Sequence, residues 1–164
     1  MTTVGRQLAM SSETKSTLLT SPLFQLWCPQ GSIEFAELQG ITSEVEHHDY
    51  AETGPLGAQY GRHVGRRKPP IVTLRRAMRV GPSTTWVWTW HQLVARGVPG
   101  ARRDCLLSLF GPNDPPDLPA PTSYMLISAF PAKVELAGAK SGGTEVIYQT
   151  LTVVCDDMID AAAA

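Results

Sequence analysis

The stretch TLRRAMRVGPSTTWVWTWHQLVARG, residues 73–97, runs from a strand pattern directly into a helix pattern. At its start, Val72, Leu74 and Met78 fall on one face of an extended chain and polar side chains, beginning with Thr73, fall on the other. This alternation predicts a strand with one buried face and one face in water.

A helix is predicted immediately after this strand. Pro82, followed by Ser83 or Thr84, is a typical start signal, and Gly97 is a typical stop. No other part of the chain carries so complete a helix pattern. The sequence therefore predicts a single helix.

The helix contains three of the four tryptophans of the chain. Trp86, Trp90 and Leu93 follow one another at the spacing of a stripe that faces a core. Trp88 lies nearly opposite that stripe at roughly 100° per residue, so it cannot share the same burial. We expect it to lie under the segment 51–70 or to meet a neighbouring subunit. The residues expected in the core are Trp86, Trp90, Leu74, Leu107 and Leu151.

The rest of the chain consists of short apolar segments separated by turn residues, which is typical of antiparallel β structure. We expect a mainly β fold: an antiparallel β sandwich or partial barrel with one flanking α-helix. Gly40 predicts a bend, and Pro131 predicts an edge, bend or bulge between two strands. The segment 143–159 is the longest strand candidate. The strand candidates are 22–28, 35–38, 43–50, 71–78, 102–110, 122–130, 133–138 and 143–159.

Three segments are expected along the chain: a polar N-terminal extension over 1–20, one β domain over 21–160 and a short C-terminal tail over 161–164. Within the domain, residues 51–70 contain several glycines and prolines and predict a long irregular loop. Loops of this length usually have a function or bind a partner.

The composition is that of a globular protein, with 43% hydrophobic and 18% charged residues in 164 and a net charge of −1. The first twenty residues do not resemble a signal peptide, and no apolar run is long enough for a membrane span. Synthesis in the cytoplasm is expected. Cys28, Cys105 and Cys155 lie in apolar runs without metal spacing, which indicates free buried thiols.

The sequence does not predict a catalytic, metal or cofactor site. The histidines lack standard zinc-ligand spacing, and the pair Asp156 and Asp157 lies at a strand end where carboxylates commonly face water. A nucleophile elbow and a phosphate-binding loop are absent from the sequence.

The basic run GRHVGRRK, residues 61–68, allows three interpretations. It could neutralise phosphates of a nucleic acid, form a solvated loop, or act as an arm that pairs with acids of an adjacent copy. Because acidic residues precede it closely and balance its charge, we prefer the arm to nucleic-acid binding. The acids considered are Glu44, Glu46, Asp49 and Glu52.

Several stretches together resemble the tail tube proteins of contractile phages and phage-tail-like injection systems. No single motif is specific, but their order and spacing are, and the resemblance extends from about residue 23 to about residue 159. The stretches are FAELQGI (35–41), VEHHDYAETG (45–54), VTLRRA (72–77), VWTW (87–90), RRDCLLSL (102–109), SAFPAKV (128–134) and TEVIYQTLTVVCDDM (144–158).

The resemblance implies hexameric rings that complete a larger β-barrel around a lumen and stack as a tube. It also implies sheath subunits, baseplate or hub proteins and a cargo of effector protein or DNA as partners, and assembly in a bacterial or phage-infected cytoplasm without a membrane step. The subunit-interface residues expected are Glu52, Gly54, Tyr60, Arg62, Arg66, Arg67, Lys68 and Trp88.

The sequence departs from the family pattern in places. Ala77 replaces a glycine, and Phe130 and Val134 replace tryptophans. These changes leave open a tube initiator or baseplate adaptor ring of the same particle. A β domain that binds nucleic acid is the third alternative.

Overall fold

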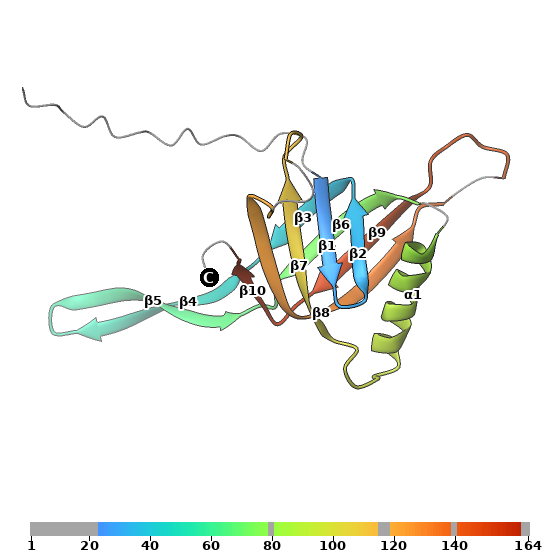
Figure 1. Cartoon of the computed structure of the whole chain (residues 1–164). Coiled ribbons are helices and arrows are strands. Elements are labelled where there is room, and N and C mark those ends of the chain that lie inside the picture. Colours follow the sequence, from blue (N-terminus) through green and yellow to red (C-terminus); the bar gives the residue numbers. More distant parts are fainter. Residues whose placement is uncertain (1–22, 79–80, 115–118, 139–140, 162–164) are drawn as a thin grey trace, which may run out of the picture.

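The computed structural model describes residues 23–78, 81–114, 119–138 and 141–161 (Figure 1). The expected extension over 1–20 lies outside the described residues. The described part contains ten strands and one helix, which confirms a mainly antiparallel β fold with a single helix. The elements are β1 Leu23–Cys28, β2 Gly31–Phe35, β3 Glu37–Thr42, β4 Val45–Gly54, β5 Gly57–Arg67, β6 Ile71–Ala77, α1 Pro82–Ala95, β7 Arg103–Phe110, β8 Thr122–Leu136, β9 Tyr148–Val154 and β10 Asp157–Asp160.

One curled sheet forms the body of the molecule. Its strand order is β2-β1-β7-β8-β9-β6-β3, with β10 paired to β8, while β4 and β5 form a separate two-stranded sheet. The two end strands, β2 and β3, are separated in sequence by Ala36 alone, and the Ala36 N–H donates to the Arg75 carbonyl over 3.1 Å. The sheet therefore bends back on itself as a partial barrel.

The core fills the inside of this curl. Alternate side chains of each strand point inward, and Leu74, Leu107 and Leu151 are completely buried. The helix closes the core with Trp90, which is 2% exposed and donates its indole N–H to the Ala101 carbonyl over 2.7 Å. Trp86 is partly buried and stacks on Trp90 at a centroid distance of 5.4 Å.

The helix has the predicted bounds. It begins at Pro82, directly after the N-cap Gly81, and packs against β8. After Ala95 the chain turns at Gly97, whose φ of 67° is in the left-handed region that glycine adopts readily. No helix among the described residues combines the length and apolarity that a membrane crossing requires.

The prediction of an irregular loop over 51–70 is wrong. Most of this segment belongs to a long hairpin in which β4 pairs with β5, closed at the Gly54–Gly57 pair. Gly61 lies opposite Tyr50, and a Cβ at position 61 would overlap the tyrosine ring. The glycine thus makes room for an aromatic ring on the neighbouring strand, an arrangement that stabilises a sheet.

Three further strand predictions were wrong in their bounds. The candidate 35–38 spans the end of β2 and the start of β3, and β3 continues through Gly40 with a register shift. Residues 122–136 form one strand of 15 residues, because β8 continues through Pro131 with a register shift between Pro131 and Lys133. The bulge expected at the proline is therefore present, but it does not end the strand. The segment 143–159 is divided into β9 and β10, since the chain turns at Asp156, whose N–H donates to the Ile127 carbonyl.

A second irregularity of β8 leads to a prediction about stability. Ser128 has a φ of 53°, and its N–H donates to Asp104 Oδ1 over 2.8 Å where the register with β7 shifts. A β-branched side chain is strongly disfavoured there, so Ser128→Val should lower the free energy of unfolding by about 1–3 kcal/mol. Urea denaturation measures this change.

The matched control is Thr122→Val, which places the same side chain on the same strand. We expect it to change the free energy of unfolding by less than about 1 kcal/mol. Equal costs for the two variants would contradict a conformational origin at Ser128.

Candidate subunit interface

The β4–β5 hairpin is the most exposed element of the chain. It pairs only with itself and projects from the curled sheet on the side away from α1 (Figure 1). With ten residues in β4, the ribbon is about 30 Å long. A ribbon of two strands is marginally stable in water without a surface to pack on. Its length and exposure make it a candidate contact surface.

Large apolar side chains on this hairpin face solvent. Leu56 at the tip is 94% exposed, Tyr60 is 84% exposed and Val64 is 70% exposed. The register places Tyr60 opposite Ala51 and Val64 opposite His47, so both belong to one face of the ribbon. The ion pair of Arg62 with Asp49 lies between them on the same face, so this face mixes exposed apolar and charged side chains and is a candidate interaction surface.

The charged residues of the hairpin differ in part from the sequence prediction. Arg62 pairs with Asp49 at 2.7 Å, Arg67 with Asp157 at 2.5 Å and Lys68 with Glu44 at 2.9 Å, all within one chain. The hydrogen bond from Glu44 also raises the pKa of Lys68. Asp49 and Glu44 therefore already have partners within their own chain, and a contact of the arm with acids of an adjacent copy stays a prediction.

Three charged residues of the hairpin have no ion pair among the described residues: Glu46 and Arg66 near the base and Glu52 near the tip. The pairs at Arg67 and Lys68 lie at the hairpin base, where they orient the ribbon relative to β10 and to the residue preceding β4. Glu52 and Arg66 are the charges best placed to meet another chain.

Trp88 does not lie under the hairpin. It is partly exposed on α1 and meets the edge of the His91 ring at a centroid distance of 6.3 Å, while His91 Nδ1 lies 2.9 Å from the Pro131 carbonyl oxygen. Since the hairpin leaves from the other side of the molecule (Figure 1), one of the two expected positions is excluded. A contact with a neighbouring subunit stays a prediction.

Two neighbouring rows on one face of the curled sheet, called the polar face below, are polar and electrically balanced, and they are flanked on the same face by rows with Ile71 and Tyr148. Two cross-strand rows on the outer face of β3, β6, β9 and β8 consist mainly of threonines and charged residues. Glu37 pairs with Arg75 at 3.3 Å and Lys133 with Glu135 at 2.7 Å, so two negative and two positive side chains cancel. The rows are Glu37, Arg75, Thr150 and Glu135, and Gly40, Thr73, Thr152 and Lys133.

This polar face ends in two open strand edges. In the described part of the chain, β3 pairs on one side only, with β6. The last part of β8, from Phe130, pairs with β9 but no longer with β7. Unpaired edges of this kind are templates for strands of another chain.

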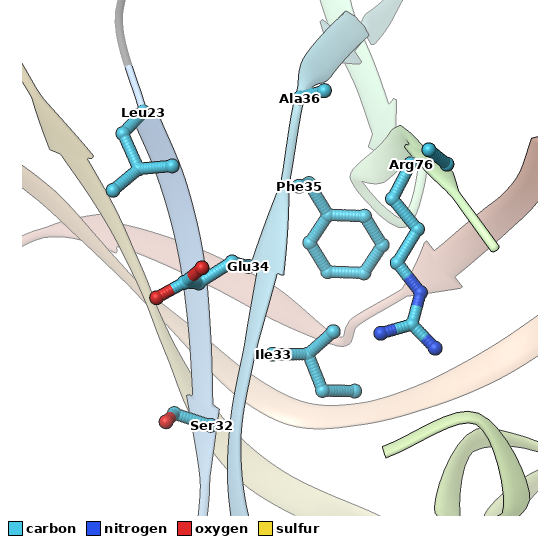
Figure 2. A pocket seen from close by; sticks show the side chains of 8 residues that line it. Leu23, Ser32, Ile33, Glu34, Phe35, Ala36 and Arg76 are labelled. Carbon is cyan, nitrogen blue, oxygen red and sulfur yellow. The ribbon is translucent and has the colours of Figure 1, made fainter. Parts of the chain in front are cut away.

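A pocket of about 280 Å³ lies along the free edge of β2. Figure 2 shows Phe35 and Arg76 on one side of this strand and Glu34 on the other. Arg76 is 7% exposed, lies 5.9 Å from the Phe35 ring and donates from Nε to Gln149 Oε1 over 2.9 Å. The pocket beside Arg76 marks a third open strand edge that meets solvent, in addition to the edges of β3 and β8.

Sequence reasoning missed the burial of Arg76. The residue has the same parity as Val72 and Leu74 and therefore points into the core with them. The alternation of Val72, Leu74 and Arg76 along the strand could have predicted this burial, but charged residues rarely occupy inward positions.

All three cysteines are free and buried, as predicted. Within the described ranges, no three His, Cys, Asp or Glu side chains converge in a way that could hold a metal ion. Burial, with smaller contributions from the carboxylates of Asp157 and Asp156, raises the pKa of the Cys155 thiol to about 11.

Because the pKa of the Cys155 thiol is raised in the fold, we expect the protein to lose stability in alkali. Its pKa is 9.0 in the unfolded chain and about 11 in the fold, so the folded chain keeps a proton that the unfolded chain loses between these values. The contribution of the Cys155 thiol to the free energy of unfolding is fully present below pH 9 and is lost as the pH rises through 11. Relative to Cys155→Ala, the wild type should lose about 2 kcal/mol of unfolding free energy over this window.

Urea denaturation at a series of pH values measures the difference between the two proteins. Both should lose stability in alkali, because burial and the Cys105 thiol also raise the pKa of Cys28. A wild-type curve parallel to that of the variant would contradict the prediction for Cys155.

Comparison with known proteins places this geometry in one family. Residues 21–159 match the family described as T4-like virus tail tube protein gp19, and the chain belongs to it. It is therefore a structural subunit of a tube. No curated protein matches the chain in sequence.

Solved structures share the fold. A chain of the anti-feeding prophage baseplate, 18% identical, superposes with a TM-score of 0.64 over 92% of this chain and 97% of its own. A chain of the sheath–tube complex of PVC, an extracellular contractile injection system in its extended state, is 14% identical, with a TM-score of 0.60 over 93% of this chain and 98% of its own.

Proposed function

We propose that the chain is the inner-tube subunit of a contractile phage tail or phage-tail-like injection system and forms hexameric rings that stack around a lumen. The observation that carries this proposal is the exposed β4–β5 hairpin, in a chain that belongs to the tail tube family. The hairpin extends about 30 Å from the body and carries large apolar side chains, Leu56, Tyr60 and Val64, that the described part of its own chain leaves exposed.

The open edges support a ring. The β3 edge of one subunit can pair with the β8 edge of the next, because both border the same polar face. Repeating this contact closes a cylinder of strands and removes the exposed edges. The balanced face with Thr73, Thr150 and Thr152 then lines the lumen.

The hairpin supports stacking of the rings. The face with Tyr60 and Val64 would pack on a subunit of the adjacent ring, while Glu52, on the opposite face, and Arg66 would form ion pairs with neighbouring subunits. The sequence-predicted interface thus keeps Tyr60, Gly54 and Trp88 as contact residues, whereas Arg62, Arg67 and Lys68 hold the hairpin in shape.

The tube would act within a larger particle. Sheath subunits would surround it, a baseplate or hub would start it, and an effector protein or DNA would pass through its lumen. Assembly would take place in the bacterial or phage-infected cytoplasm. The relatives whose structures carry the same fold come from a baseplate and a sheath–tube complex, which supports this setting.

Negative-stain electron microscopy of the purified chain, over a range of protein and salt concentrations, tests the proposal. We expect long hollow tubes or stacked rings with sixfold symmetry. Single rings that do not stack at any concentration would point instead to a tube initiator or baseplate adaptor. A monomer that remains dispersed even with baseplate particles as template would contradict the tube subunit.

A further inference from the structure

Two cysteines face each other across neighbouring strands. Cys28 ends β1 and Cys105 lies near the start of β7, and the register that pairs Trp27 with Leu106 brings the two cysteines together as the next pair. Their sulfur atoms lie 2.6 Å apart, and both residues are completely buried. The contact is therefore built into the strand register.

The position suits a covalent bond between the sulfurs. Residues directly opposite each other on antiparallel strands have Cα atoms about 4.5–5.5 Å apart, which lies within the range that disulfides span. The third thiol is directed elsewhere, since Cys155 Sγ donates to the Pro70 carbonyl over 3.7 Å. Cys28 and Cys105 thus face each other, whereas the thiol of Cys155 contacts the backbone instead.

We propose that Cys28 and Cys105 are a site of reversible oxidation that closes an intrachain disulfide when the chain meets a small peroxide. One thiol is oxidised by hydrogen peroxide to a sulfenic acid with release of one water. The second thiol attacks that sulfur, the S–S bond forms and a second water leaves. Two thiols and one peroxide therefore yield one disulfide and two waters.

The oxidant must be small and uncharged because the pair is enclosed. The hydrogen bond with Cys105 and burial raise the pKa of the Cys28 thiol, so little thiolate is present at neutral pH and the reaction is slow. In a reducing cytoplasm the pair stays as thiols, and outside the cell it closes.

The bond would fasten one end of the curled sheet. β2 is held by strand pairing only to β1, and β1 joins the remaining sheet through β7. A disulfide at the end of β1 fixes this terminal pair of strands to the body. The link would strengthen a subunit after its particle has left the cell.

Thiol counting on the intact chain tests the proposal. The folded protein is treated with hydrogen peroxide at pH 8.5 and then denatured, and its thiols are counted. The count should fall from three to one, and dithiothreitol should restore all three. Peptide mapping without reduction should show Cys28 joined to Cys105 within one chain. A denatured sample treated in the same way shows that the reagent is active.

Two variants separate the pair from the single thiol. Cys155→Ser should still lose its two remaining thiols at the wild-type rate, whereas Cys105→Ser should form no intrachain disulfide. Three thiols that persist in the folded wild type, a disulfide that includes Cys155, or links only between chains would each overturn the proposal. The wild-type result needs no variant, so a Cys105→Ser protein that fails to fold does not weaken the test.

Discussion

Replacing Glu46–Arg66 with a two-residue Asn-Gly turn should abolish stacking of the rings and leave the curled sheet folded. The register pairs Val45 with Arg67, so a tight turn can join these two positions without displacing either strand end. The Lys68 N–H to Glu44 carbonyl bond and their ion pair remain at the base. Because the hairpin pairs only with itself, the core loses no strand contact.

Electron microscopy and circular dichroism together measure this outcome. We expect no tubes at any protein concentration and a far-ultraviolet spectrum that still shows β structure. A second variant replaces only Pro55–Leu56 with Asn-Gly; it preserves the ribbon and measures how much the exposed leucine at the tip contributes to stacking. Tubes of normal length from the shortened protein would contradict our assignment of the stacking contact.

The Trp90→Ala variant should lose about 3–5 kcal/mol of unfolding free energy, the usual cost of removing a large buried aromatic side chain. Trp90 closes the core from the helix, is 2% exposed and supports the stacked ring of Trp86. The variant also leaves the Ala101 carbonyl without its indole donor. A loss of this size approaches the whole stability of many domains, so much of the variant should be unfolded.

Urea denaturation of the monomer gives the comparison. Trp88→Ala on the same helix is the control, since it removes the same side chain from a partly exposed position, and it should cost less than about 1 kcal/mol in the isolated chain. If Trp88 meets a neighbouring subunit, the same variant should instead weaken tube assembly. Equal costs for the two monomers would show that Trp90 does not close the core.

Local patterns in the sequence predicted the parts of the fold that depend on local chemistry. Alternation identified the strands with Leu74 and Leu107, and the pair Pro82 and Gly97 gave the bounds of the helix. The order of motifs also predicted the family, which the comparison confirmed.

The parts that depend on pairing over distance could not be predicted in this way. By local rules Gly61 indicates a loop. In the structure it belongs to β5, where it pairs with Tyr50 of β4. By local rules Pro131 indicates the end of a strand. In the structure β8 continues through Pro131, because it stays paired with β9 on both sides of a register shift.

The subunit interface stays a prediction, but the structure shows how its charged residues pair within the chain. The sequence identified the hairpin region as the contact surface and assigned its basic residues to partners on another copy. Asp49, Asp157 and Glu44 instead pair with those residues in the same chain. Such pairs require the folded ribbon, because Asp157 lies far away in sequence from Arg67.

The balanced rows of threonines and ion pairs on the outer face of β3, β6, β9 and β8 have a consequence for transport. In the tube that we propose, a lumen lined by these rows would offer a travelling molecule little net charge to hold it or to turn it back. The work of moving through such a conduit should therefore depend on the width and stiffness of the traveller, and hardly at all on its charge or on the salt in the medium.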